Sequence, residues 1–198
     1  MNDTAQRCSW CGNDPLYVHY HDHVWGRPVA DGQELFEKLC LDGQQAGLSW
    51  ITILRKQESY RTAFDHFDAE KIVRYDDAKI EALLQDPGII RNRLKVNSII
   101  RNARGYLEFA ERGESFSEFI WSFVGGRPII NERGSLADVP AVTPEAEALS
   151  RALKKRGFNF VGPTICYAFM QAVGMVNDHL LNCPARSASL KDAQTFQL

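Results

Sequence analysis

Residues 40 to 50 form a polar, glycine-containing segment inside a sequence that otherwise favours helices. The segment reads CLDGQQAGLSW, so a carboxylate, two amides and two glycines stand next to the apolar side chains of Leu48 and Trp50. Helix interiors disfavour such a combination, because glycine destabilises a helix and buried polar groups need partners. The sequence therefore predicts a break between two helices at this point, where a pocket can open.

Helix-capping residues and apolar residues at helical spacing recur along the rest of the chain. The helices that these signals predict begin after Asp31, at Trp50, after Asp68, after Asp76 or Asp77, before Val96, after Ser115, after Thr143 and after Gly162. The first of them should end near Asp42-Gly43, and the second should continue as far as Phe64. Only Ile129-Ile130, within a long loop over residues 125–142, favours an extended conformation. The predicted fold class is all-α.

The two ends of the chain lack a clear helical pattern. Residues 7–26 are so rich in aromatic, His, Cys and Gly residues that we expect a packed but irregular N-terminal arm. We expect one domain over residues 1–186 and a disordered tail over residues 187–198. The two ends of that domain are where metal-ligating residue types gather.

The overall composition is that of an ordinary globular protein. The chain has 198 residues, a net charge of -2 and five cysteines, and no apolar run or leader that would suggest membrane insertion or secretion. We therefore expect a cytoplasmic monomer with free or metal-bound thiols. A slightly acidic chain does not suggest a nucleic-acid partner. Basic residues do cluster in one segment, and they belong either to a local DNA-binding face or to solvated helix faces: Arg91, Arg93, Lys95, Arg101 and Arg104.

The segment from Gly88 to Lys95 separates two predicted helices. Helix, tight glycine-containing hairpin and helix, near residues 77–111, is the order of elements in a DNA-binding helix-hairpin-helix. Such a hairpin offers backbone N–H groups and a helix N-terminus to a phosphate. Any connection between two helices can have this pattern, so the pattern alone is a weak indication.

A metal site is the second candidate, because Zn²⁺ in structural sites takes four Cys and His ligands. His179 and Cys183 have the spacing of one half of such a site. Several residues of the N-terminal arm compete for the other half: Cys8, Cys11, His19, His21 and His23. Spacing alone favours Cys8 with Cys11.

Several short motifs resemble one family. They are LDGQQAGLSW at 41–50, DPLY at 14–17, YHD at 20–22, WG at 25–26, GIIRNR at 88–93, KKRGF at 154–158, FVGPT at 160–164 and VNDH at 176–179. Together they resemble the bacterial DNA-3-methyladenine glycosylase I family, over roughly residues 7–183. One position departs from the family pattern, because Asp42 stands where the family usually carries glutamate.

The resemblance implies the roles of individual residues. It points to Cys8 and His21, with His179 and Cys183, as ligands of one structural zinc ion, and leaves Cys11 as the competing candidate. It implies that Asp42 is the catalytic carboxylate. The base pocket would be formed by Tyr20 and Trp50, with Trp10, Tyr17 and Trp25 nearby. The DNA-binding residues would be Leu48 as a wedge, Gly88 in the hairpin, and Arg91, Arg93 and Lys95 on phosphates.

The expected activity is that of a DNA repair glycosylase. It would flip 3-methyladenine out of alkylated double-stranded DNA, hydrolyse the N-glycosidic bond, and leave an abasic site and free 3-methyladenine. We expect no lyase step, because no lysine stands beside the central turn to form a Schiff base. The alternative is a zinc-stabilised protein that binds DNA or alkylated bases and has weak or lost catalysis because of Asp42. A hydrolase with catalytic zinc is a third class, which four protein ligands would exclude.

Overall fold

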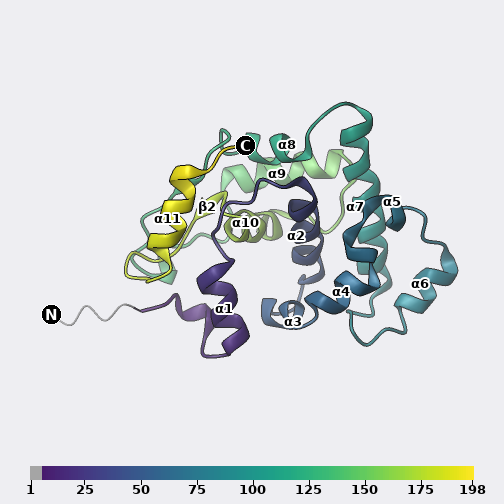
Figure 1. Cartoon of the computed structure of the whole chain (residues 1–198), viewed down its shortest axis with the longest axis horizontal. Helices are drawn as coiled ribbons and strands as arrows, with labels where there is room; N and C mark the ends of the chain where they lie inside the picture. Colours follow the sequence, from purple (N-terminus) through teal and green to yellow (C-terminus); the bar gives the residue numbers. More distant parts are fainter. Residues whose placement is uncertain (1–5) are drawn as a thin grey trace.

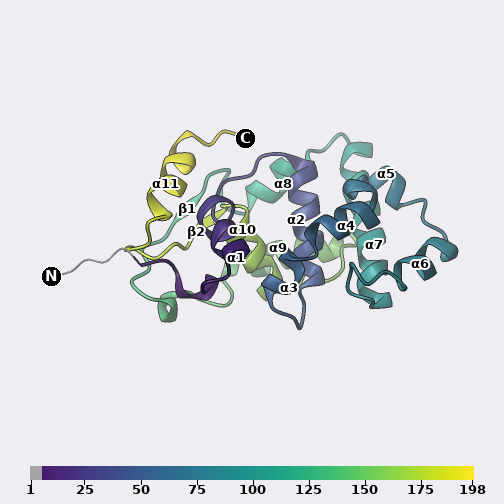
Figure 2. The same ribbon diagram turned by 60° about the horizontal axis from the view of Figure 1, so that its bottom comes forward.

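Helix α2 (Gly32–Gln44) runs through the middle of the molecule and packs against helices on both of its sides (Figure 1). The computed structural model describes residues 6–198. Two views show the same division: α1, α11 and the strands lie on one side of α2, and α4 to α7 lie on the other (Figures 1 and 2). The C-terminal end of α2 lies between these two sides.

Regular structure in the described residues consists of helices and one pair of short strands. The α-helices are α1 (Pro15–His23), α2, α3 (Trp50–Leu54), α4 (Gln57–Ala63), α5 (Ala69–Ile72), α6 (Asp77–Leu83), α7 (Arg93–Glu111), α8 (Phe116–Ser122), α9 (Pro144–Lys155), α10 (Pro163–Ala172) and α11 (Arg186–Thr195). The 3-10 helices are η1 (Ser9–Cys11), η2 (Asp65–Phe67) and η3 (Leu136–Asp138), and the strands are β1 (Ile129–Ile130) and β2 (Val176–Asn177). The predicted all-α class is confirmed in the coarser sense that the described residues are mostly helical, with one pair of short strands besides.

Several predicted helix starts carry the expected cap. The side chain of Asp31 accepts a hydrogen bond from the N–H of Glu34, and Asp76, not Asp77, caps α6. Ser115 and Thr143 cap α8 and α9 in the same way. These caps satisfy N–H groups that have no partner within the helix.

The central break lies a little later than predicted. Helix α2 continues through Asp42 and Gly43 to Gln44, and the turn that follows has Gly47 at a φ of +76°. Gly43 is needed for packing, because a Cβ atom there would lie 3.1 Å from both the Cβ and the carbonyl oxygen of Phe160. The predicted helix from Trp50 to Phe64 is divided into α3 and α4.

The prediction of an irregular N-terminal arm was wrong for residues 15–23, which form α1. Asp14 caps this helix by accepting from the N–H groups of Leu16 and Tyr17, and Pro15 occupies its first turn. This start signal is strong enough to form a helix from aromatic and histidine residues, although they have modest helix propensity.

The prediction of a disordered tail was also wrong, because α11 covers most of residues 187–198. Ser189 is buried; its hydroxyl donates to the carbonyl of Gly26 and accepts from the side-chain amide of Asn177. Beyond the helix, the ring of Phe196 lies 4.2 Å from that of Trp121, between centroids. These contacts hold the C-terminal segment against the body of the protein.

The long loop over residues 125–142 contains the predicted extended piece. Strand β1 pairs in parallel with β2, with Ile129 opposite Val176. This pairing brings β2 and the residues after it, Asp178 and His179, to a fixed place beside α10. Among the described residues no helix is long and apolar enough to cross a membrane.

Candidate functional site

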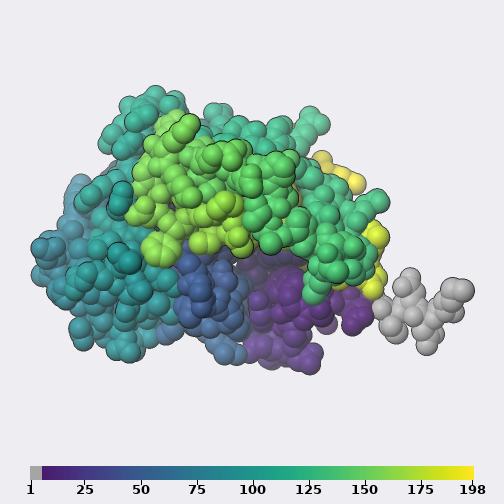
Figure 3. All heavy atoms as spheres, turned by 180° about the vertical axis from the view of Figure 1, so that it is seen from behind, coloured from purple at the N-terminus to yellow at the C-terminus, as the bar shows by residue number. Residues whose placement is uncertain are grey.

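A cavity of about 340 Å³ lies next to the C-terminal half of α2. Figure 3 shows the purple N-terminal segment and the blue segment around the central turn side by side, below the green part of the chain. The cavity is lined from all three regions. It brings together all six residues that were predicted for the catalytic and base-binding roles: Trp10, Tyr17, Tyr20, Trp25, Asp42 and Trp50.

Aromatic rings form much of its wall. The rings of Tyr20 and Trp50 lie 5.5 Å apart between centroids, and Trp10 lies 5.2 Å from Tyr17 and 5.0 Å from Trp25. Tyr20 and Trp25 come from the N-terminal arm, whereas Trp50 begins α3 after the central turn. A flat ligand that touched both Tyr20 and Trp50 would therefore contact two separate parts of the chain.

Two buried polar atoms in this wall have no hydrogen-bond partner. They are the Oδ2 oxygen of Asp42, an acceptor, and the Nε1 atom of Trp50, a donor. Buried polar atoms in native proteins nearly always have a partner, so an unpaired donor and acceptor facing one cavity indicate a polar ligand. The pocket combines aromatic faces with both kinds of hydrogen-bonding group.

Lys38 also lines the pocket, and the sequence analysis missed it. It stands one helical turn before Asp42 on α2, and its Nζ atom lies 2.6 Å from Asp42 Oδ1 and 3.5 Å from the centroid of the Trp50 ring. Burial lowers the pKa of Lys38 and raises the pKa of Asp42, and the attraction between the two opposes both shifts. The expectation that no lysine stands beside the central turn was wrong, because Lys38 lies next to Asp42 at the end of α2. The i,i+4 spacing of Lys38 and Asp42 was visible in the sequence.

Asp178 and Gln171 are two further pocket residues that the analysis did not single out. Asp178 is buried and accepts hydrogen bonds from Gln171 at 2.9 Å, Asn131 at 2.8 Å, Arg133 at 3.1 Å and Tyr167. Burial would raise the pKa of this carboxyl, but the hydrogen bonds hold the pKa below its usual value. Asp178 therefore acts as a charged anchor for α10 and β2 on one side of the pocket.

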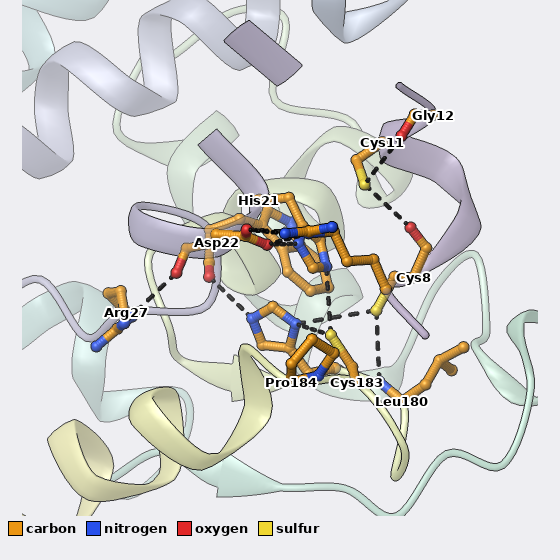
Figure 4. A network of polar contacts seen from close by, with 12 residues as sticks. Cys8, Cys11, Gly12, His21, Asp22, Arg27, Leu180, Cys183 and Pro184 are labelled. Carbon is orange, nitrogen blue, oxygen red and sulfur yellow. Dashed lines mark hydrogen bonds and ion pairs between the residues drawn. The ribbon is translucent and has the colours of Figure 1, made fainter. Parts of the chain in front are cut away.

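The four predicted metal ligands lie close together. Figure 4 shows three of them, Cys8, His21 and Cys183, facing one another. The ligand atoms of Cys8, His21, His179 and Cys183 are all within 4.8 Å of one another, and all four residues are buried. Nδ1 of His179 lies 3.9 Å from the sulfur of Cys8 and 3.6 Å from that of Cys183, and Nε2 of His21 lies 3.6 Å from the latter. Two sulfurs and two imidazole nitrogens facing one point are the donor set of a tetrahedral zinc site.

The outward-facing nitrogen of each histidine has its own partner. Nδ1 of His21 lies 2.7 Å from a carboxylate oxygen of Asp22, and Nε2 of His179 lies 3.1 Å from the carbonyl oxygen of Trp25. Such contacts fix the orientation of metal-binding imidazoles. The neighbouring thiol groups raise the pKa of Cys8 and lower the pKa of Cys183, and the imidazoles of His179 and His21 lower the pKa of Cys183 further.

Cys11, the competing candidate, faces away from the cluster. Its thiol lies 3.2 Å from the carbonyl oxygen of Cys8 (Figure 4). Edge-to-face ring contacts join the cluster to the pocket: His179 lies 4.7 Å from Trp25, and His21 lies 5.1 Å from Trp10, between centroids. The cluster therefore holds the arm that supplies the aromatic wall.

The chain matches the family model described as "Methyladenine glycosylase" over residues 10–187. This protein belongs to the methyladenine glycosylase family. It is 53% identical over 182 residues to the DNA-3-methyladenine glycosylase of Haemophilus influenzae, covering 92% of this chain and 98% of the relative. The family resemblance noted in the sequence is thereby confirmed.

Solved structures of family members have the same fold. A crystal structure of 3-methyladenine DNA glycosylase I superposes with a TM-score of 0.89 at 55% identity, covering 90% of this chain and 98% of that one. A tyrosine-to-phenylalanine variant of 3-methyladenine DNA glycosylase I, in complex with 3-methyladenine, superposes with a TM-score of 0.87 at 40% identity, covering 94% and 98%.

The predicted DNA-binding residues fall into two groups. Leu48, Arg91 and Arg93 are exposed, whereas Gly88 and Lys95 make contacts within the protein. Leu48 is 37% exposed at the central turn, so it is not buried between helices. Arg91 and Arg93 are exposed between α6 and α7, and Arg93 pairs with Glu81 at 2.6 Å. Leu94, 71% exposed beside them, was not singled out from the sequence.

Gly88 and Lys95 have structural contacts. A Cβ atom at Gly88 would lie 2.8 Å from that of Ser59, and the N–H of Gly88 donates to the carboxylate of Asp86 at 2.7 Å. Gly88 therefore shapes the hairpin through close packing, and its own N–H is already paired.

The prediction that Lys95 neutralises a phosphate was wrong. Lys95 is only 7% exposed, and its Nζ atom donates to the carbonyl oxygens of Gln44 and Ala46, both at 2.7 Å. It satisfies carbonyl groups left open where α2 ends. Lys95 thus joins the central turn to the start of α7. It thereby holds the exposed Leu48 next to the exposed Arg91 and Arg93.

Proposed function

We propose that this protein is a DNA-3-methyladenine glycosylase that flips 3-methyladenine out of alkylated DNA and hydrolyses its N-glycosidic bond. The observation that carries the proposal is the pocket, where an unpaired carboxylate oxygen and an unpaired indole N–H lie among aromatic rings. Family membership and the named activity of the relatives support the same reaction.

The pocket suits the chemistry of the lesion. An N3-methylated adenine in DNA is cationic, and its glycosidic bond is already weakened, so recognition matters more than a strong general acid. The rings of Trp50 and Tyr20 offer stacking and cation-π contact, and Oδ2 of Asp42 offers an acceptor to the exocyclic amine. The carboxylate would also stabilise positive charge on the sugar as the bond breaks.

We propose that Cys8, His21, His179 and Cys183 hold one zinc ion with a structural role. Their donor set and mutual distances support four protein ligands, which leave no open position for catalysis. The ion would join the N-terminal arm to the segment after β2, and so stabilise the wall of the pocket.

The DNA grip is proposed to use the central turn and the hairpin between α6 and α7 as a helix-hairpin-helix. Leu48 would fill the gap left by the extruded nucleotide, and Arg91 and Arg93 would contact phosphates. The first N–H groups of a helix lack acceptors within it, so those of α7, at Arg93 and Leu94, would face a phosphate bound at its N-terminus. Double-stranded DNA would thus be bound with little dependence on sequence.

We further propose that the protein acts as a monomer in the cytoplasm.

The test is release of 3-methyladenine from methylated duplex DNA by the purified protein, with an Asp42→Glu variant beside it. Release by the natural protein, within tenfold of the variant, would support a working glycosylase with a shorter carboxylate. Misplacement by ~1 Å can reduce a rate ~100-fold. Release only by Asp42→Glu would instead favour the alternative, a protein that binds alkylated bases and has lost the chemistry.

A further inference from the structure

The place where a flat base would stack is already occupied by a positive charge. Nζ of Lys38 lies 3.5 Å from the centroid of the Trp50 ring and 5.8 Å from that of Tyr20, while its side chain is 12% exposed. The same atom forms an ion pair with the carboxylate of Asp42, at 2.6 Å from Oδ1. In this arrangement an ammonium makes both contacts that the pocket offers to a cationic ligand, an aromatic face and a carboxylate.

We propose that Lys38 is a displaceable internal cation, which competes with the cationic base for Asp42 and Trp50 and so determines the selectivity of the pocket. The proposal rests on the proposed function, because it takes this pocket as the base site. A base cannot occupy the face of Trp50 while an ammonium lies 3.5 Å above it. Two positive charges beside one carboxylate would also repel each other.

The structure offers Lys38 a second position. Its side chain lies between the base pocket and a neighbouring cavity of about 720 Å³, and it lines both. Glu34 lines that second cavity and stands one helical turn before Lys38, as Asp42 stands one turn after it. Lys38 therefore has a carboxylate at i-4 and another at i+4, one for each cavity.

Glu34 is a suitable acceptor for the displaced ammonium. Among the described residues it is in no ion pair, whereas Glu37 nearby pairs with Arg61 at 2.7 Å. Burial and the neighbouring carboxylates of Asp31 and Glu37 raise the pKa of Glu34, so an ammonium beside Glu34 would relieve the repulsion among these three carboxylates. A rotation of the Lys38 side chain would transfer its charge from Asp42 to Glu34 as the base enters.

The test compares two ligands that differ in charge. The probes are 3,9-dimethyladeninium, which is permanently cationic, and 3-methyladenine, which is neutral as the free base, with affinities measured by calorimetry at pH 8. Lys38→Met should raise the ratio of the affinity for the cationic probe to the affinity for the neutral probe on the order of tenfold. Lys38→Arg, which keeps the charge, should retain the discrimination of the natural protein and shows that the effect is one of charge.

Glu34→Gln tests the second position. It should weaken binding of the cationic probe about threefold in the natural background and leave it unchanged in Lys38→Met, because no ammonium is then left to relocate. An equal effect in both backgrounds would overturn the second position. If Lys38→Met left the ratio of the affinities for the cationic and the neutral probe unchanged, the proposal as a whole would be overturned.

The outcome for the proposed function is separate, because these affinities do not require catalysis. Thermal unfolding of each variant checks that it folds. Failure of every variant to release 3-methyladenine from DNA, with the binding pattern as predicted, would contradict the glycosylase activity and leave the role of Lys38 intact.

Discussion

His179 and Trp25 connect the Cys/His cluster to the base pocket. Nε2 of His179 lies 3.1 Å from the carbonyl oxygen of Trp25, and the two rings meet edge to face at 4.7 Å. If a metal ion were bound to Nδ1, Nε2 would carry the proton and would donate a hydrogen bond to this carbonyl. Metal binding would thereby orient a residue of the pocket wall.

Removal of one metal ligand should therefore affect stability and substrate affinity more than chemistry. We expect Cys183→Ala to lose about one equivalent of zinc and roughly 3–5 kcal/mol of folding free energy, as when other structural links between chain ends are lost. The folded fraction should release 3-methyladenine with a similar kcat and a raised KM. Metal analysis, thermal unfolding and steady-state kinetics measure these quantities.

Cys11→Ala is the matched control, because its sulfur lies outside the cluster. It should keep its zinc. If zinc were lost from Cys11→Ala and retained by Cys183→Ala, the assignment of the ligands would be wrong.

Lys95 and Arg91 should give different phenotypes although both are basic residues near the hairpin. Lys95→Met leaves two buried carbonyl groups without their donor, so we expect a loss of about 2–3 kcal/mol in the free energy of unfolding. Arg91→Ala removes an exposed charge, so it should preserve stability and reduce the salt dependence of DNA binding by about one phosphate contact. Denaturant titration and DNA binding at several salt concentrations separate the two. A lowered salt slope in a stable Lys95→Met variant would contradict the structural role of Lys95.

The buried carboxylate of Asp178 should matter for stability. In Asp178→Asn one oxygen is replaced by an amide donor that faces other donors, and we expect a loss of roughly 3 kcal/mol. Because the pKa of Asp178 is lowered in the folded state, its contribution is complete above the unfolded value of about 4 and is lost as the pH falls through the folded pKa. Urea unfolding should therefore show a difference at pH 7 that narrows below about pH 4. Asp192→Asn, at a partly exposed surface pair with Arg27, should change stability by less than about 1 kcal/mol.

Lys38 also permits a direct test for strand cleavage. A lyase step needs a neutral amine to attack the abasic sugar, whereas the ammonium of Lys38 is held by Asp42 at 2.6 Å. We still expect no lyase activity, and thus no covalent adduct when the protein is treated with borohydride on DNA that contains an abasic site. An adduct that forms with the natural protein and disappears in Lys38→Met would show that the enzyme is bifunctional.

Local signals allowed much of the helical fold to be predicted. Asp31, Asp76, Ser115 and Thr143 each cap the helix expected of them, because capping depends on a few neighbouring residues. The same kind of signal, Asp14 followed by Pro15, was present before α1 but was outweighed by the unusual composition of the arm. Helix α11 has no such cap and is held by tertiary contacts of Ser189, which the sequence does not reveal.

The site could be predicted from residue types and resemblance, but the roles of its lysines could not. Asp42, Tyr20 and Trp50 stand in recognisable motifs, whereas Lys38 and Lys95 look alike as basic residues on helices. Only tertiary packing shows that Lys95 points to the end of α2 and that Lys38 points into the pocket. A charged residue near a predicted DNA-binding segment is therefore weak evidence of a phosphate contact.

The most direct test of the account is the single-turnover rate of 3-methyladenine release from methylated duplex DNA by Asp42→Asn and by the natural protein. The variant keeps the size of the side chain and removes its charge. We predict a rate lower on the order of 100-fold, with DNA binding unchanged, because the carboxylate both accepts from the base and stabilises the developing cation. An Asp42→Asn enzyme that releases the base as fast as the natural protein would contradict the catalytic role of Asp42.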